Sequence, residues 1–378
     1  MFLERALKRL GLVVNPIAGM GGRVGLKGSD GVETLIRAKE LGATETSPAR
    51  AAEALKQLAV MKAQFELFTY PGEMGEEEAR SVGFEPRVLG KIKAGETTSA
   101  DTKAAAIEMA RLGVDLLLFA GGDGTARDVC EAIDGNVSAL GIPTGVKIHS
   151  GVYAISPTAA GALAVKYLTG EVTSVQQAEV MDIDEDAFRD NRLSARLYGY
   201  LRVPREEAYI QGSKEATPVH EDENLKAIAA DLADEMTPDT LYVLGPGSTI
   251  SSVAEQLGLK KTLLGVDVVQ GGKIVASDVN EEQLLRLVTG KRTKIVVTVI
   301  GGQGFVFGRG NQQLSPRVIR AVGRENIVIA ATPAKLETLH GKPLLVDTGD
   351  PALDAELTGY TRVVTDYGRR VVYRVKGG

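Results

Sequence analysis

The chain alternates short apolar runs with helix-forming stretches over roughly its first 150 residues. The apolar runs, which predict buried strands, are residues 10–14, 65–70, 115–120 and 138–142. The stretches that predict helices are residues 49–62, 101–112 and 125–133. Strands that are apolar throughout and separated by helices indicate a parallel sheet covered on both faces.

The pattern is less regular in the middle of the chain and becomes regular again after residue 240. A helix is predicted over residues 158–168, strands and turns over 182–205, and a charged helix over 223–236. The further predicted strands are residues 241–245, 263–269, 295–300, 327–331, 361–365 and 370–375. The further predicted helices are residues 250–257, 281–288 and 315–322.

These elements predict an α/β fold with more than one domain, as the length of 378 residues also indicates. We expect an N-terminal domain over residues 1–150, with an open parallel sheet and helices on both faces. A larger mixed α/β domain is expected over residues 151–345. A β-rich tail is expected over residues 346–378, and it can pack back on the N-terminal domain.

Glycine is the compositional outlier, with 44 of 378 residues. Average glycine usage is roughly 7%, so the surplus must serve backbone geometry. The net charge of −5, without a long run of like charge, argues against a nucleic-acid or membrane-surface partner. No apolar stretch approaches the ~20 residues that span a bilayer, and the N-terminus does not resemble a secretory signal. We therefore expect a cytoplasmic protein, and its single cysteine, Cys130, excludes an internal disulfide.

Glycine-rich turns directly follow four of the predicted strands. They are residues 15–22 (NPIAGMGG), 121–125 (GGDGT), 245–249 (GPGST) and 301–304 (GGQG). In an open parallel sheet such turns share the carboxyl edge, where their backbone N–H groups can approach a phosphate. Each turn taken alone has a second explanation: its glycines are needed for tight packing and for turns with positive φ. Neither GxxxxGK[ST] nor an early GxGxxG is present, so ordinary P-loop and dinucleotide fingerprints are missing.

Asp123 is the reactive side chain of the turn 121–125. A carboxylate inside a phosphate cradle is poorly placed to bind an anion. It is well placed to accept a proton from an attacking hydroxyl, or to hold Mg²⁺ beside a triphosphate. The alternative is an aspartate that only stabilises the turn.

Several stretches resemble one superfamily of kinases. Residues 13–16 (VVNP) with Gly19, and residues 119–125 (FAGGDGT), are similar to the NAD kinase and diacylglycerol kinase superfamily. Residues 141–150 (GIPTGVKIHS) and 301–311 (GGQGFVFGRGN) resemble the ATP-NAD kinase-like branch, which includes AcoX-like proteins. The resemblance covers most of the chain. Its GGDGT element is specific for the superfamily but not for the acceptor substrate.

The resemblance implies an NAD kinase-like fold and an ATP- or polyphosphate-dependent kinase with its active site between two domains. Asp123 would be the base that activates the 2′-hydroxyl of the NAD adenosine ribose. Mg²⁺ would enter with ATP, and no metal ligands are assigned. The expected nucleotide-binding residues are Asn15, Gly19, Gly21, Gly22, Gly121, Gly122, Gly124, Thr125, Gly145, Lys147, Ser150, Gly247 and Ser248.

Two features depart from the usual NAD kinase pattern. Pro143-Thr144-Gly145 stands where those enzymes carry an Asn-x-Gly turn, and the one Asn-Glu pair, Asn280-Glu281, is interpreted as a helix N-cap. In the altered loop, Lys147 and Ser150 could neutralise a transferring phosphate and His149 could hydrogen-bond it. The alternative is a half-buried polar loop.

The acceptor therefore stays open at this point. NAD is the leading acceptor, and the alternatives are another small hydroxyl compound or a lipid, or a nucleotide-binding regulator without turnover. A homo-oligomer without nucleic-acid or membrane partners is expected. Asp267 is a further candidate, because it interrupts the apolar run 263–269 and a buried carboxylate is costly unless it is paired.

Overall fold

The computed structural model describes residues 7–26, 32–133, 135, 137–145, 148–183, 195–206, 208–211 and 222–377. The chain divides into two compact units, and the segments of these units interleave along the sequence. The first unit comprises Met1–Met20 and Thr44–Ser213, and the second comprises Gly21–Ala43 and Lys214–Gly378. This division differs from the expected cut near residue 150.

The first unit contains a parallel sheet whose strands lie in the order β3-β2-β1-β4-β5. Its strands are β1 (Lys8–Val14), β2 (Phe65–Thr69), β3 (Arg87–Val88), β4 (Leu116–Gly121) and β5 (Ala139–Pro143). Every residue of β4 is buried, as expected for a central strand between two helical layers. Because β1 neighbours β4, the winding direction of the chain reverses between these two strands, and this pair marks the topological switch point of the sheet.

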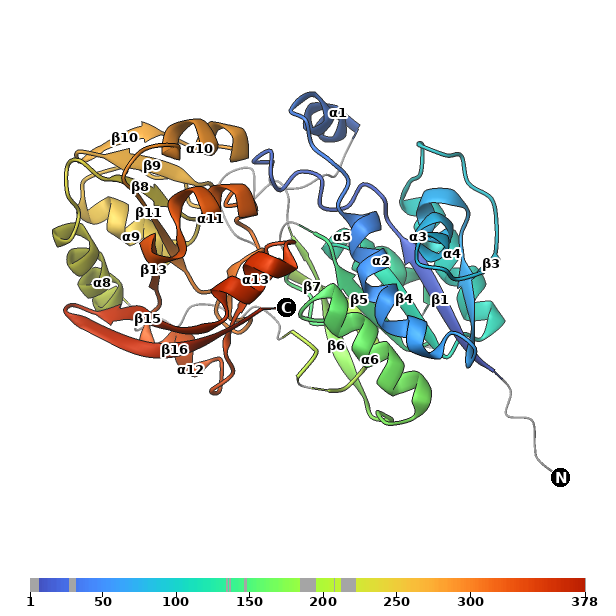
Figure 1. Ribbon diagram of the computed structural model, residues 1–378. Helices are drawn as coiled ribbons and strands as arrows, with labels where there is room; N and C mark the ends of the chain where they lie inside the picture. The colour runs from blue at the N-terminus through green and yellow to red at the C-terminus, as the bar shows by residue number, and fades with distance from the viewer. Residues whose placement is uncertain are drawn as a thin grey trace. The chain divides into compact units, whose positions relative to one another are not determined.

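Helices cover both faces of this sheet. They are α2 (Ser47–Leu58), α3 (Glu76–Ser81), α4 (Ser99–Leu112), α5 (Asp123–Ile133) and α6 (Pro157–Thr169), with the 3₁₀ turns η1 (Ala59–Met61) and η2 (Gly72–Met74). Helices α2 and α6 pack against each other, whereas α4 packs on α5 (Figure 1). Local sequence sets the ends of α6: the Ser156 side chain accepts the Ala159 N–H, and Gly170 ends the helix at φ 82°.

A two-stranded antiparallel ribbon completes the first unit. It consists of β6 (Val175–Ile183) and β7 (Ala195–Pro204). β6 contacts α5, and Arg202 of β7 forms a parallel bridge with Ser138 at the start of β5. These contacts explain why the first unit continues past residue 150.

The second unit contains a mixed sheet of nine strands in the order β10-β9-β8-β11-β13-β15-β16-β14-β12. The strands are β8 (Leu241–Leu244), β9 (Asp267–Gln270), β10 (Lys273–Ala276), β11 (Thr293–Thr298), β12 (Phe305–Phe307), β13 (Ile327–Ala330), β14 (Leu344–Val346), β15 (Gly359–Asp366) and β16 (Arg369–Gly377). β8, β11, β13 and β15 are parallel, whereas β9 and β16 run antiparallel to β8 and β15. The expected tail thus supplies β15 and β16 to the interior of this sheet.

The helices of the second unit are α1 (Val32–Glu40), α8 (Asp222–Asp234), α9 (Ser248–Gln256), α10 (Glu281–Val288), α11 (Pro316–Val322), α12 (Pro333–Glu337) and α13 (Pro351–Leu357), with the 3₁₀ turn η3 (Arg324–Asn326). The side chain of Asn280 caps α10 by accepting the Gln283 N–H, which confirms the predicted N-cap. Two apolar clusters form the core of this unit. Among the residues that the structure describes, no helix is both long and apolar enough to cross a bilayer.

The predicted α/β fold is confirmed. The first unit has the open parallel sheet with helices on both faces, and the second unit has the mixed α/β architecture.

Candidate active site

Three loops meet at the carboxyl edge of the sheet in the first unit, at its switch point. They follow β1, β4 and β5. The Asn15 N–H donates to Ala120 O at 3.0 Å, and the Asn15 side-chain amide donates to Thr125 Oγ1 at 3.0 Å. The Thr144 N–H donates to Gly121 O at 3.1 Å. The sequence-predicted residues Asn15, Gly121 and Thr125 are therefore brought together.

The glycines of these loops allow close backbone approach. A Cβ on Gly145 would lie 2.8 Å from the Cα of Gly122, and a Cβ on Gly121 would overlap the Thr125 side chain. Gly19 has φ 82°, and a Cβ there would overlap Thr144 O. Packing alone thus accounts for these glycines, as the alternative interpretation of the turns anticipated. Gly124 lies half-buried in the first turn of α5.

Asp123 is the first residue of α5 and is buried, with 7% of its surface exposed. Its Oδ1 accepts the Ser150 N–H at 3.1 Å and the Ser150 hydroxyl at 2.6 Å. Its Oδ2 accepts the His149 N–H at 2.8 Å and lies 3.2 Å from His149 Nδ1. A carboxylate that is ionised only accepts hydrogen bonds, so the contact between Oδ2 and Nδ1 is a hydrogen bond when the His149 ring carries its proton on Nδ1.

The segment that carries these donors is held by residues from other parts of the first unit. The Gln211 side-chain amide donates to Ser150 O at 2.9 Å, and the Met181 N–H donates to Ser150 Oγ at 2.9 Å. The Tyr153 hydroxyl donates to Gly122 O at 2.5 Å. Sequence reasoning missed Gln211, Met181 and Tyr153, because nothing in their local pattern links them to residue 123.

The altered loop 143–150 therefore supplies hydrogen bonds to Asp123. The hydroxyl of Ser150 takes part in these bonds instead of facing a ligand. Ser150, which the sequence placed among nucleotide contacts, has no exposed surface, and its hydroxyl bonds Asp123. His149, expected to contact phosphate, is likewise buried against Asp123. Lys147 lies outside the described residues.

The four glycine turns do not share one sheet edge, which corrects the expectation from the sequence. The turns 245–249 and 301–304 follow β8 and β11, which are neighbouring strands of the second sheet. The first turn is itself divided, because Gly21 and Gly22 belong to the second unit, where a Cβ on Gly22 would lie 3.0 Å from Gln312. A glycine turn after an apolar strand carries no information on which sheet that strand joins.

In the second unit, Gly247 begins α9 with φ 109°, and Ser248 is exposed. The neighbouring Thr249 is fully buried, and its hydroxyl accepts a hydrogen bond of 2.7 Å from the Lys335 ammonium. Lys335 lies in α12, directly after β13, so a buried cation stands at the same sheet edge as the turn 245–249. Lys335 lies far from the turn 245–249 in the sequence, so no local sequence pattern indicated that the two would meet.

The Asp267 carboxylate accepts hydrogen bonds from neighbouring residues of the second unit. It accepts the Thr262 N–H at 2.6 Å, the Thr262 hydroxyl at 2.8 Å and the Asp278 N–H at 2.7 Å. It begins β9 instead of interrupting a longer strand, because residues 263–266 form a loop. Burial lowers the pKa of the adjacent Lys261 to about 8. These bonds give Asp267 a role in organising the loop.

The family-like stretch 301–311 ends in a buried ion pair. Arg309 Nη1 lies 2.7 Å from Asp347 Oδ2, and both side chains are almost completely buried. The Arg309 guanidinium also lies over the Phe305 ring, 4.4 Å from its centroid. The part of this stretch around Arg309 is thus explained by packing within the second unit.

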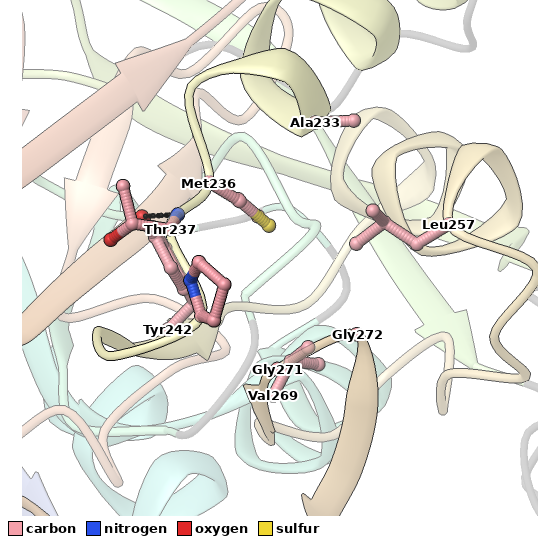
Figure 2. Close-up of a pocket in the computed structure, with 9 residues that line it drawn as sticks. Ala233, Met236, Thr237, Tyr242, Leu257, Val269, Gly271 and Gly272 are labelled. Carbon is pink, nitrogen blue, oxygen red and sulfur yellow. Dashed lines mark hydrogen bonds between the residues drawn. The ribbon is translucent and has the colours of Figure 1, made fainter.

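A small cavity in the second unit lies away from the glycine-bearing edge of the sheet in that unit. It measures about 170 Å³ and lies near the start of β8, at the end opposite the turn 245–249. Figure 2 shows its lining, which is mainly apolar: Ala233, Met236, Thr237, Pro238, Tyr242, Leu257, Val269, Gly271 and Gly272. The Thr237 N–H donates to the Tyr242 hydroxyl at 2.9 Å. None of the described residues that line this cavity is charged, so it offers no acid or base for phosphotransfer.

The described residues contain no group of three or more His, Cys, Asp or Glu side chains that could hold a metal ion. Mg²⁺ is commonly held by one or two carboxylates together with substrate phosphates and water.

A parallel sheet with an acid-bearing glycine turn at its switch point defines a class of nucleotide-handling α/β proteins. Within that class, residues 10–172 match the ATP-NAD kinase N-terminal domain and residues 237–375 match the ATP-NAD kinase C-terminal domain. The chain belongs to the ATP-NAD kinase family, and its two matched domains support an ATP-dependent kinase. No curated protein matches the chain.

Proposed function

We propose that the protein transfers the γ-phosphoryl group of ATP to the 2′-hydroxyl of NAD and so forms NADP. The observation that carries this proposal is Asp123, a fixed carboxylate within a glycine turn at the sheet's switch point. The match to both ATP-NAD kinase domains supports the donor and favours NAD as acceptor. ATP and NAD as substrates favour a cytoplasmic enzyme.

In the proposed step, an electron pair of the acceptor oxygen forms a new bond to the γ-phosphorus. The bond from that phosphorus to the β,γ-bridging oxygen breaks, and its electron pair leaves with ADP. Asp123 takes the proton of the acceptor hydroxyl. Mg²⁺ supplies charge neutralisation when it is bound with ATP. Positioning and electrostatic stabilisation account for most of such catalysis.

The residues around Asp123 are proposed to form the nucleotide site of the first unit. They are Asn15, Gly19, Gly121, Gly122, Gly124, Thr125 and Gly145, with Lys147 as a further phosphate contact. Gly21, Gly22, Gly247 and Ser248 of the second unit stay predictions as nucleotide contacts, and within that unit Lys335 lies beside Thr249. A homo-oligomeric state and membership of the AcoX-like branch stay predictions.

Replacement of Asp123 by Asn tests the proposal. Loss of a general base lowers kcat by about 10²- to 10⁴-fold, so NADP formation should fall by that factor. Asp128→Asn is the matched control, because Asp128 is also buried on α5 but lies beside Lys103 rather than in the site. A kcat of Asp123→Asn close to the wild-type value would remove the base from the mechanism.

A kinase for another hydroxyl acceptor is the second candidate. The altered loop 143–150 favours it, because the usual Asn-x-Gly turn is absent and the loop carries the Asp123 donors instead. A panel of nucleotide, sugar and lipid acceptors with labelled ATP separates the two functions. Binding of ATP without labelled product from any acceptor would favour a regulator.

A further inference from the structure

One oxygen of the Asp123 carboxylate receives two hydrogen-bond donors from a single residue, Ser150. The Ser150 N–H donates to Oδ1 at 3.1 Å, and the Ser150 hydroxyl donates to the same oxygen at 2.6 Å. The second contact has the length of a strong bond between a hydroxyl and an ionised carboxylate. A carboxylate offers about four lone-pair sites on its two oxygens, so these two donors fill Oδ1. A substrate hydroxyl that is to give its proton to Oδ1 therefore needs one of them to withdraw.

The two donors on Oδ1 differ in whether they can withdraw. The peptide N–H is held by the backbone, because the Gln211 amide donates to Ser150 O at 2.9 Å and the Gly151 N–H donates to Glu179 O at 2.9 Å. The hydroxyl has a second acceptor within reach, since Ser150 Oγ lies 3.3 Å from Met181 O. The Met181 N–H donates to the same Oγ at 2.9 Å. The oxygen can therefore stay in place while the hydroxyl hydrogen turns about the Cβ–Oγ bond.

The other oxygen of Asp123 is harder to open. Oδ2 accepts the His149 N–H at 2.8 Å and lies 3.2 Å from Nδ1 of the His149 ring, which is buried. A buried ring in a close-packed interior can leave only if its neighbours also move, whereas rotation of a hydroxyl moves one hydrogen atom. Oδ1 is therefore the oxygen that can be opened with the smaller rearrangement.

We propose that Ser150 is a positioning residue whose hydroxyl alternates between two acceptors. Without substrate, it donates to Asp123 Oδ1 and holds the carboxylate in place. When the acceptor binds, the hydroxyl turns to Met181 O, and the acceptor hydroxyl donates to Oδ1 instead. Ser150 has no exposed surface, so it acts through Asp123 and does not touch the substrate. This inference rests on the proposed kinase function and adds to it the way in which the base is opened.

Ser150→Ala removes the hydroxyl and keeps the backbone donors. Asp123 is then held by one donor fewer, and because misplacement of a reacting group costs about 10²-fold in rate, kcat should fall by about tenfold or more, up to that limit. The KM for ATP should stay the same, and the KM for NAD should not rise, because no hydroxyl has to withdraw. Ser138→Ala is the matched control, since the Ser138 hydroxyl is also buried but is hydrogen-bonded to the Tyr167 hydroxyl, so kcat should not change.

The inference is overturned if Ser150→Ala keeps the wild-type kcat, or if its KM for NAD rises as kcat falls, since that pattern indicates a distorted binding site. Urea unfolding of both variants is measured in parallel. The kinetics are then compared at a temperature at which both variants are folded.

A crystal structure of the wild-type complex tests the exchange of acceptors without any variant. With NAD and β,γ-methylene-ATP bound, Ser150 Oγ should lie closer to Met181 O than to Asp123 Oδ1, because Oγ and Oδ1 no longer share a hydrogen atom. This is the reverse of the order in the protein without substrate. A complex in which Oγ stays closer to Oδ1 contradicts the exchange. A protein that binds ATP but phosphorylates no acceptor would reject the proposed function instead.

Discussion

Two buried carboxylates in the first unit differ in how their oxygens are satisfied. Both oxygens of Asp123 accept hydrogen bonds from the segment 149–150, whereas Oε2 of Glu78 has no hydrogen-bond partner. Glu78 is buried on α3, with 5% of its surface exposed, and desolvation raises its pKa from 4.5 to about 7. The raised pKa of Glu78 means that burial favours its neutral form, whereas the Asp123 carboxylate is surrounded by hydrogen-bond donors.

The raised pKa of Glu78 predicts a stability that falls as pH rises. The folded state binds the Glu78 proton more tightly than the unfolded state, so this stabilisation is complete below pH 4.5 and is lost as pH rises through about 7. A shift from 4.5 to about 7 corresponds to roughly 3 kcal/mol at 1.36 kcal/mol per pKa unit. Glu78→Gln should therefore match the wild type near pH 5 and become more stable than it near pH 8.

Urea unfolding at both pH values measures this difference. Glu85→Gln is the control, because Glu85 is exposed in the same unit and, unlike Glu77, is not among the charges that raise the pKa of Glu78, so its substitution should change stability equally at both pH values. A Glu78→Gln effect that does not vary with pH would contradict the account.

At the scale of elements, one glycine sets how closely two helices of the first unit approach. Gly161 lies on the buried side of α6, and a Cβ there would overlap the carbonyl oxygen of Ala54 on α2. The atom in the way belongs to the backbone, so it cannot move aside by a rotamer change. The helix pair α2–α6 must therefore separate to accept any side chain at this position.

Gly161→Ala should destabilise the protein by about 1–3 kcal/mol, the usual cost of overpacking a close-packed core. This loss of stability is opposite in sign to the effect of helix propensity, which favours Ala over Gly by about 1 kcal/mol in a helix interior. Chemical denaturation measures the change. Gly301→Ala provides the comparison, because its Cβ would lie 3.8 Å from the nearest atom, Lys335 Cγ. Equal stabilities of the two variants would mean that the helix contact is looser than described.

The local sequence pattern predicts most strands and helices of the first unit, and it also predicts Asp123 as the centre of the site. The central strands β1, β4 and β5 are built on continuous apolar runs, and Asp123 stands in a short, recognisable turn between a strand and a helix. The local pattern could not predict which distant segments pair. It gave no indication that Gln211 holds the Asp123 loop or that Lys335 meets Thr249.

At the scale of the whole molecule, the end of the chain is part of a sheet interior. β15 and β16 lie between β13 and β14 in the order of the second sheet, although the sequence indicated a separate tail. A pairing of β14 with the later strand β16 is non-local, and alternation of apolar residues does not encode it. The two units are also interleaved, because the chain passes between them after Met20 and Ala43.

Truncation after Leu357 should therefore prevent folding of the second unit. The change removes two strands that connect the halves of the sheet, so β14 and β12 lose their link to β13. Circular dichroism and urea titration should show lost secondary structure and no cooperative transition from that unit. Deletion of Gly378 alone is the control and should leave both signals unchanged. A truncated chain that unfolds like the full chain would contradict the strand order.

The most direct test of the central claim is the formation of NADP from ATP and NAD by the purified protein, read with an NADP-specific dehydrogenase. The account predicts ATP-dependent NADP formation by the wild type, with a rate about 10²-fold or more lower in Asp123→Asn. NADP formation that is equal in both proteins, or a wild type that forms none, would contradict it.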